Sequence, residues 1–132
     1  MTMSTLLDLH RRIIDQIAEA IIYADTKGII REWNGAAEHI FGFPKVEAIG
    51  QSLDLIIPER LRRAHWEAFD RAMERGSTAH SGHASLTRAI NRKGETIYVE
   101  MSFAVVTDDD HLATGSVAVA RDVTERERAA RQ

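Results

Sequence analysis

The sequence predicts a single α+β domain in which an antiparallel sheet of about five strands carries helices on one face. Three observations support this prediction. Two pairs of apolar segments each flank a short turn that contains glycine, which is typical of β-hairpins. Between the two hairpins, apolar residues recur at the spacings of helices. The 132 residues, 44% of them hydrophobic, are enough to form one hydrophobic core.

An amphipathic helix is predicted at the start of the chain, over residues 4–20. Ser4 is suited to cap it. Apolar residues recur along it at spacings of three and four: Leu6, Leu9, Ile13, Ile17 and Ala20. Such a helix either covers the core or meets a copy of itself. We assign residues 1–18 to this linker and dimerisation helix, and expect a parallel homodimer through its first four apolar positions.

The first hairpin covers residues 20–34 and turns at Asp25-Thr26-Lys27-Gly28, where glycine supplies a positive φ. Two short helical segments follow, one ended by Gly42 and one lying between Pro44 and Gly50. A longer helix then runs from about Pro58 to Arg75, where Gly76 stops it.

The second half of the chain changes from helical to alternating periodicity. Segments 83–90 and 95–106 flank Asn91-Arg92-Lys93-Gly94 as a second hairpin, and 112–123 forms the last strand. One face of segment 95–106 is apolar: Ile97, Val99, Met101, Phe103 and Val105. We assign residues 19–124 to the main domain and 125–132 to the start of a C-terminal helix, with Thr124 and Glu127 as its capping box.

The composition of the chain argues against several classes of function. The formal charge of −3 gives no electrostatic reason to expect nucleic acid or an anionic membrane as a partner. The chain has no cysteine, signal peptide or long apolar run, which favours a cytoplasmic location. The motifs of common enzyme classes are also missing, so we expect no enzyme activity from this domain.

These elements together resemble the PAS sensory family. The residues that carry the resemblance are "IIYADTKGIIREWNGAAEHIFGF", "EAIGQSL", "NRKGETIYVEMSF" and "VARDVTERE". The resemblance implies a five-stranded antiparallel sheet that encloses a small cavity against its helices. It also implies a bacterial sensor or dimerisation module followed by an output domain, as in two-component histidine kinases, cyclic-di-nucleotide enzymes, chemoreceptors and transcription regulators.

His65 is the residue with the most unusual placement. At 100° per residue it lies on the apolar side of the long helix, together with Leu61, Phe69 and Ala72. Two interpretations stay open. His65 is either a core histidine bonded to a backbone carbonyl, or an axial ligand to a metal held in the cavity. His80 and His83 are more simply read as surface residues than as a metal site.

The segment "PERLRRAH" resembles the one that carries the proximal haem histidine in oxygen-sensing PAS domains of rhizobial kinases and of a bacterial phosphodiesterase. The resemblance implies haem ligated by His65, with Arg71 on a propionate. The second propionate partner falls on Ala79, beside His80. The distal arginine falls on Ser85, a poorer donor to oxygen, so carbon monoxide, nitric oxide or redox state is an equally suitable signal.

The rest of the expected cavity comes from apolar residues. Phe69, Met101 and Phe103 bound it, and the Met101 thioether either packs on the porphyrin or binds the iron. The alternative is a PAS module without haem. Such a module binds a small organic ligand or FAD, or keeps an empty cavity and acts by dimerising and relaying a signal.

Overall fold

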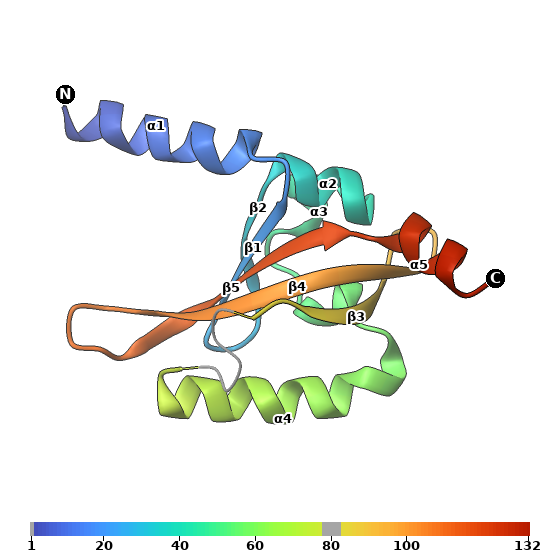
Figure 1. Cartoon of the computed structure of the whole chain (residues 1–132). Helices are drawn as coiled ribbons and strands as arrows, with labels where there is room; N and C mark the ends of the chain where they lie inside the picture. Colours follow the sequence, from blue (N-terminus) through green and yellow to red (C-terminus); the bar gives the residue numbers. More distant parts are fainter. Residues whose placement is uncertain (1, 78–82) are drawn as a thin grey trace.

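The computed structural model describes residues 2–77 and 83–132. Its sheet has five antiparallel strands in the order β2-β1-β5-β4-β3 (Figure 1). The strands are β1 (Ala20–Asp25), β2 (Ile30–Trp33), β3 (Ser85–Ile90), β4 (Thr96–Thr107) and β5 (Ala113–Asp122). The helices are α1 (Met3–Gln16), α2 (Gly35–Phe41), α3 (Lys45–Ala48), η1 (Leu53–Ile56), α4 (Glu59–Arg75) and α5 (Thr124–Ala130). The predicted fold class is confirmed.

Both predicted hairpins are present. The first turns at Gly28, whose φ of 77° lies in the left-handed region that glycine adopts without a steric cost. The Asp25 carboxylate accepts hydrogen bonds from the backbone N–H groups of Lys27 and Ile29, which fixes the loop. The second hairpin turns at Gly94, with φ 78°. The last strand, β5, then enters between β1 and β4 and joins the two hairpins into one sheet.

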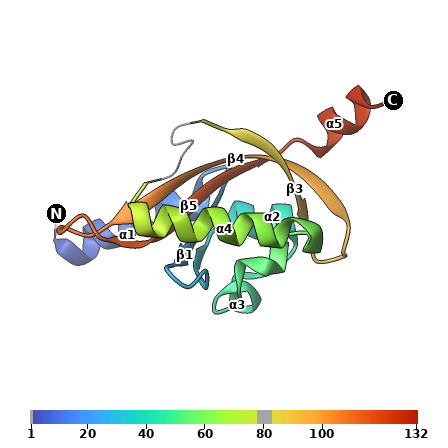
Figure 2. The same cartoon turned by 90° about the horizontal axis from the view of Figure 1, so that it is seen from below.

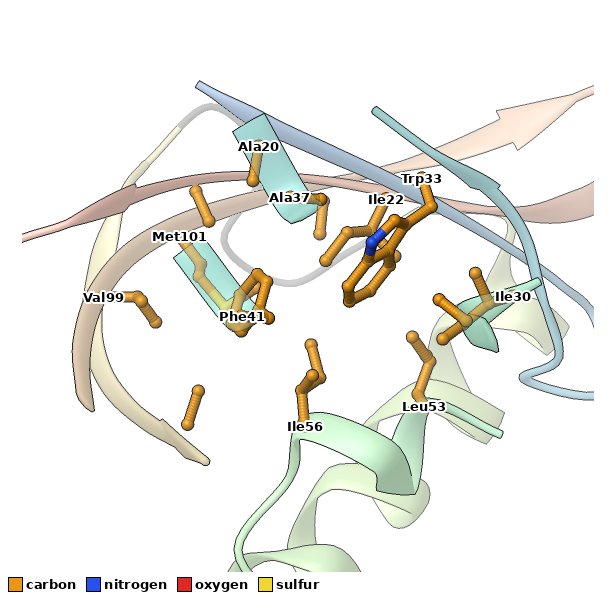
Figure 3. Packing of buried hydrophobic residues seen from close by; sticks show 14 of the residues in the cluster. Ala20, Ile22, Ile30, Trp33, Ala37, Phe41, Leu53, Ile56, Val99 and Met101 are labelled. Carbon is orange, nitrogen blue, oxygen red and sulfur yellow. The ribbon is translucent and has the colours of Figure 1, made fainter. Parts of the chain in front are cut away.

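The short elements α2, α3 and η1 and the long helix α4 cover the inner face of the sheet, and α4 runs across β5 (Figure 2). Trp33 and Phe41 are fully buried, with ring centroids 5.5 Å apart. They lie at the centre of the core that Figure 3 shows, against Ile22, Ile30 and Ala37.

Helix α1 projects from the domain and has no buried residue (Figure 1). It differs from the prediction at both ends. Thr2, and not Ser4, caps it by accepting a hydrogen bond from the Thr5 N–H. It ends at Gln16, before the predicted end at residue 20, because Ala20 already pairs with Ala120 in the sheet and is fully buried.

Asn34 fastens the end of α1 to the domain. Its side chain is fully buried and takes part in four hydrogen bonds. The Oδ1 atom accepts from the N–H groups of Ile21 and Ala37, and Nδ2 donates to the carbonyls of Ile14 and Glu19. One amide therefore caps α2 and holds the connection between α1 and β1.

The C-terminal helix α5 does not begin with the predicted capping box. Val123 occupies the N-cap position, without a side-chain cap. Thr124 is bound to the sheet instead, because its Oγ1 accepts a hydrogen bond from the Tyr98 N–H at 3.0 Å. The Asp122 carboxylate accepts a bond from the Thr124 N–H. The Arg131 guanidinium also lies 5.1 Å from the Tyr98 ring centre, so α5 is attached to β4.

Candidate functional site

A cavity of about 550 Å³ lies between helix α4 and the inner face of the sheet. Most of its lining is apolar and comes from β1, η1, α4, β3, β4 and β5. Its volume lies within the range of roughly 300–1,000 Å³ that is typical of small-molecule sites. The inner residues of β1 and β5 are small where they face α4, as at Ala24, Ser116 and Ala118, and this leaves the space open.

His65 lines this cavity from α4. Its Nδ1 atom is buried and has no hydrogen-bond partner among the residues that the structure describes. The ring lies between two aromatic neighbours, with centroids 4.6 Å from Trp66 and 5.9 Å from Phe69. The structure therefore differs from the interpretation of a core histidine bonded to a carbonyl. A polar nitrogen left in this position costs about 1–3 kcal/mol.

Burial lowers the pKa of the His65 imidazole from its ordinary value of 6.5. The negative charges of Asp54 and Asp70 act in the opposite direction and do not cancel this effect. At neutral pH the imidazole is accordingly uncharged. An uncharged imidazole is the form that ligates a metal.

Contacts in the first half of α4 fix the position of His65. The Trp66 Nε1 atom donates to the Asp54 Oδ1 at 2.8 Å, and Arg62 Nε donates to the Ile57 carbonyl at 3.0 Å. The Trp66 indole also fits directly over Gly28, where a Cβ atom would lie 2.2 Å from the ring. These contacts attach α4 to η1 and to the first hairpin, so the His65 backbone is held in place.

The charge along the cavity lining is positive. Arg71 and Arg75, one turn apart on α4, both line it, and no aspartate or glutamate is among its described lining residues. Arg88 also lines the cavity, but its guanidinium stacks at 5.5 Å on the Tyr98 ring. An apolar interior beside two arginines suits a ligand with an apolar body and an acidic group.

Six of the seven site residues proposed from the sequence line this one cavity: His65, Phe69, Arg71, Ser85, Met101 and Phe103. The seventh, His80, lies outside the described residues, as does Ala79. Whether these residues bind a ligand stays a prediction. Phe103 is 39% exposed, so it stands at the rim, whereas Met101 is 7% exposed.

Sequence reasoning missed Arg75, His83 and Ser116 as lining residues. Arg75 follows Arg71 by one helical turn, and that spacing is a signal that could have found it. His83 lies just before β3 begins at Ser85, and the sequence offered only its nearness to that predicted site residue as a signal. Ser116 had no such signal, because its place depends on β5 entering the middle of the sheet.

Within residues 2–77 and 83–132, no three histidine, aspartate or glutamate side chains gather as a metal-binding group. In the same ranges no helix is both long and apolar enough to cross a membrane. Haem differs from a simple metal ion, because the porphyrin supplies four of the iron ligands and the protein adds an axial side chain.

The five-stranded sheet and the helices that enclose a cavity against it define the class of this domain, and comparison with known families identifies it. The chain matches the family model described as the PAS fold over residues 8–123. It therefore belongs to the PAS family. Among solved structures, the PAS domain of a protein from Colwellia psychrerythraea is similar with a TM-score of 0.79 and 22% identity, over 92% of this chain and 99% of that one.

Two curated relatives add to this family assignment. The sensor protein FixL of Bradyrhizobium diazoefficiens is 30% identical over 118 residues, which cover 89% of this chain and 23% of FixL. The oxygen sensor protein DosP of Escherichia coli is 29% identical over 75 residues, which cover 57% of this chain and 9% of DosP. The chain thus spans less than a quarter of the length of either relative.

Proposed function

We propose that this PAS domain is a haem-binding sensor module that responds to a diatomic gas or to redox state, with His65 as the axial ligand. The observation that carries the proposal is the His65 imidazole, which is uncharged, partly buried, lines a ligand-sized cavity and has an unpartnered ring nitrogen. When bound, haem supplies an iron atom that accepts a diatomic ligand or changes oxidation state.

The remaining lining residues fit the two other parts of haem. Apolar side chains such as Phe69, Met101 and Phe103 suit the porphyrin. Arg71 suits a propionate because a guanidinium pairs with carboxylates in a fork-like geometry, and Arg75 lies one turn away. The oxygen sensor DosP and the sensor FixL among the relatives also support a gas-sensing role.

Haem reconstitution tests this proposal. Purified protein mixed with ferric haem should show a Soret band, and His65→Ala should lose most of it or change its position. His39→Ala is the matched control, because His39 is exposed and does not line this cavity. A wild-type protein without a Soret band would falsify the haem proposal, and so would an unaltered spectrum of His65→Ala. Circular dichroism checks that the variants are folded.

A second candidate function follows from the charge of the cavity. A small organic acid has an apolar body and a carboxylate. The apolar lining of the cavity suits the body, and Arg71 and Arg75 suit the carboxylate. FAD is also anionic, through its two phosphates, which arginine side chains bind as well. This candidate becomes the favoured one if the protein binds no haem, and Arg71→Ala should then weaken the binding of the organic ligand.

We also infer that the module forms a homodimer through α1. Leu6, Leu9, Ile13 and Ile17 are between 37% and 54% exposed, although α1 is amphipathic. Apolar residues on an unpacked helix favour a partner surface, and a second α1 supplies one of the same kind.

Truncation tests the dimer. Deletion of residues 2–11 removes Leu6 and Leu9 but keeps Ile14 and Asp15, which contact Asn34 and Lys45 in the domain. Light scattering at micromolar concentration should show a dimer for the whole chain and a shift towards monomer for the truncated one. If the truncated chain remains fully dimeric, Leu6 and Leu9 are not part of the dimer contact.

The C-terminal junction is the expected output connection. Thr124 and Asp122 join α5 to β4 and to the end of β5, so a change in the sheet reaches α5 directly. In a longer protein with an output domain, Thr124→Val should disturb the regulation of that output and leave the haem spectrum unchanged. Normal regulation in this variant would show that the junction is a passive linker.

A further inference from the structure

Two histidines line the same cavity from different elements. His65 belongs to α4, and His83 lies in the segment that leads into β3. Edge strand β3 and helix α4 border the cavity as separate elements, one from the sheet and one from the helical layer (Figures 1 and 2). The proposed axial ligand accounts for one of these imidazoles and leaves the second without a role.

His83 lines the cavity from the short segment that leads into β3. Ala89 in β3 is buried, and its partner across the ladder is the buried Ile97. Ser85 lies four residues before Ala89 and pairs with the buried Met101. The β3 residues from Ser85 to Ala89 all line the cavity, so β3 runs along its edge and His83, two residues before Ser85, lies at the end of this edge.

We propose that His83 is the second axial ligand of the haem iron, with His65 as the first. This inference rests on the proposed function, because it requires haem in the cavity. A neutral imidazole is among the commonest nitrogen ligands of iron, and the two histidines are the described imidazoles that line this cavity. His83 is exposed and is not fixed by core packing, so its side chain can turn towards a ligand in the cavity.

The other candidate for this position is Met101, whose thioether also lines the cavity. Met101 is 7% exposed and packs within the core cluster, so it is less able to reorient than His83. A thioether is also a soft ligand that suits reduced metals, whereas an imidazole binds both oxidation states of iron. We therefore assign His83 as the ligand in both the ferric and the ferrous form.

Coordination by His83 makes gas binding a ligand exchange. A diatomic gas takes the iron position as the His83 nitrogen leaves it, with no change in the number of electrons or protons. If His83 occupies the iron about nine-tenths of the time, it lowers the apparent affinity for carbon monoxide about tenfold. His83 is then a device that sets the gas concentration to which the sensor responds.

The test uses the whole chain reconstituted with ferric haem, and its readout is the spin state seen by absorption and electron paramagnetic resonance. The wild-type protein should be six-coordinate and low-spin. His83→Ala should keep its Soret band but become high-spin, and added imidazole should restore the low-spin spectrum. In the ferrous state His83→Ala should bind carbon monoxide about tenfold more tightly. Met101→Leu and His39→Ala, as controls, should remain low-spin.

Each other outcome overturns the assignment. A wild-type protein with haem that is high-spin has no sixth protein ligand, and the proposed haem function then stands without His83. A low-spin His83→Ala variant places the ligand elsewhere, and a high-spin Met101→Leu variant places it at the thioether. A wild-type protein without a Soret band removes the haem function and this inference together.

Discussion

The two halves of the inner sheet face differ sharply. In the half next to α2 and α3, Trp33 and Phe41 are fully buried, and the buried Asn34 side chain takes part in four hydrogen bonds. The half next to α4 holds a cavity of about 550 Å³ and a histidine nitrogen without a partner. One half therefore stabilises the fold, whereas the other keeps unfavourable features that a ligand can compensate.

Among the variants that test this comparison, the largest loss of stability is expected in the half around Trp33. Trp33→Ala removes a fully buried indole and its hydrogen bond to the Phe43 carbonyl, and should lower the free energy of unfolding by about 3–5 kcal/mol. Urea denaturation followed by circular dichroism measures the change.

Phe103→Ala is the matched variant in the cavity half. Full burial of a phenylalanine contributes roughly 1.5–3 kcal/mol, and this ring is 39% exposed, so the loss should be about 1 kcal/mol. Equal losses for the two aromatic residues would contradict the division into a packed half and a cavity half.

An effect of similar size but opposite sign is expected at His65 in the haem-free domain. His65→Phe replaces a buried nitrogen that has no partner with an apolar ring of similar shape, and should raise the free energy of unfolding by about 1 kcal/mol at pH 7.

The same variant tests the pH dependence. Burial lowers the pKa of His65 in the folded state below the ordinary 6.5, so the unfolded chain binds its proton first as the pH falls. The wild-type domain should therefore lose stability below about pH 6.5, and His65→Phe should lose less over the same range. Identical slopes of stability against pH for the two proteins would show that His65 is not buried as described.

Local patterns account for the elements that sequence analysis predicted correctly. Gly28 and Gly94 mark the two hairpins, and Gly76 ends α4 with a positive φ, because each of these features depends on residues within one turn. The apolar spacing around His65 likewise depends on helix geometry alone. These signals identified the fold class and the side of α4 that lines the cavity.

Features that depend on distant residues were missed. The sequence pattern favours Thr124 as a helix cap. In the structure, its hydroxyl instead accepts a hydrogen bond from the Tyr98 N–H, 26 residues away in the chain. The partners of Asn34 lie between 3 and 20 residues away and meet only after the chain has folded back. The one local signal for the role of Asn34 is its position directly before Gly35, where an asparagine is suited to cap a helix.

The strand order has a consequence for how the chain assembles during synthesis. The two hairpins, β1-β2 and β3-β4, are each complete within a few tens of residues, but they do not touch one another in the ladder. Only β5, the last strand to leave the ribosome, pairs with both, as Ile22 opposite Ala118 and Met101 opposite Ala120 show. A nascent chain that stops before Ala113 therefore exposes two separate hairpins with open edges, and such edges are prone to aggregation. The segment that closes the sheet continues directly into α5, so any domain that follows is synthesised only after every strand of the PAS sheet.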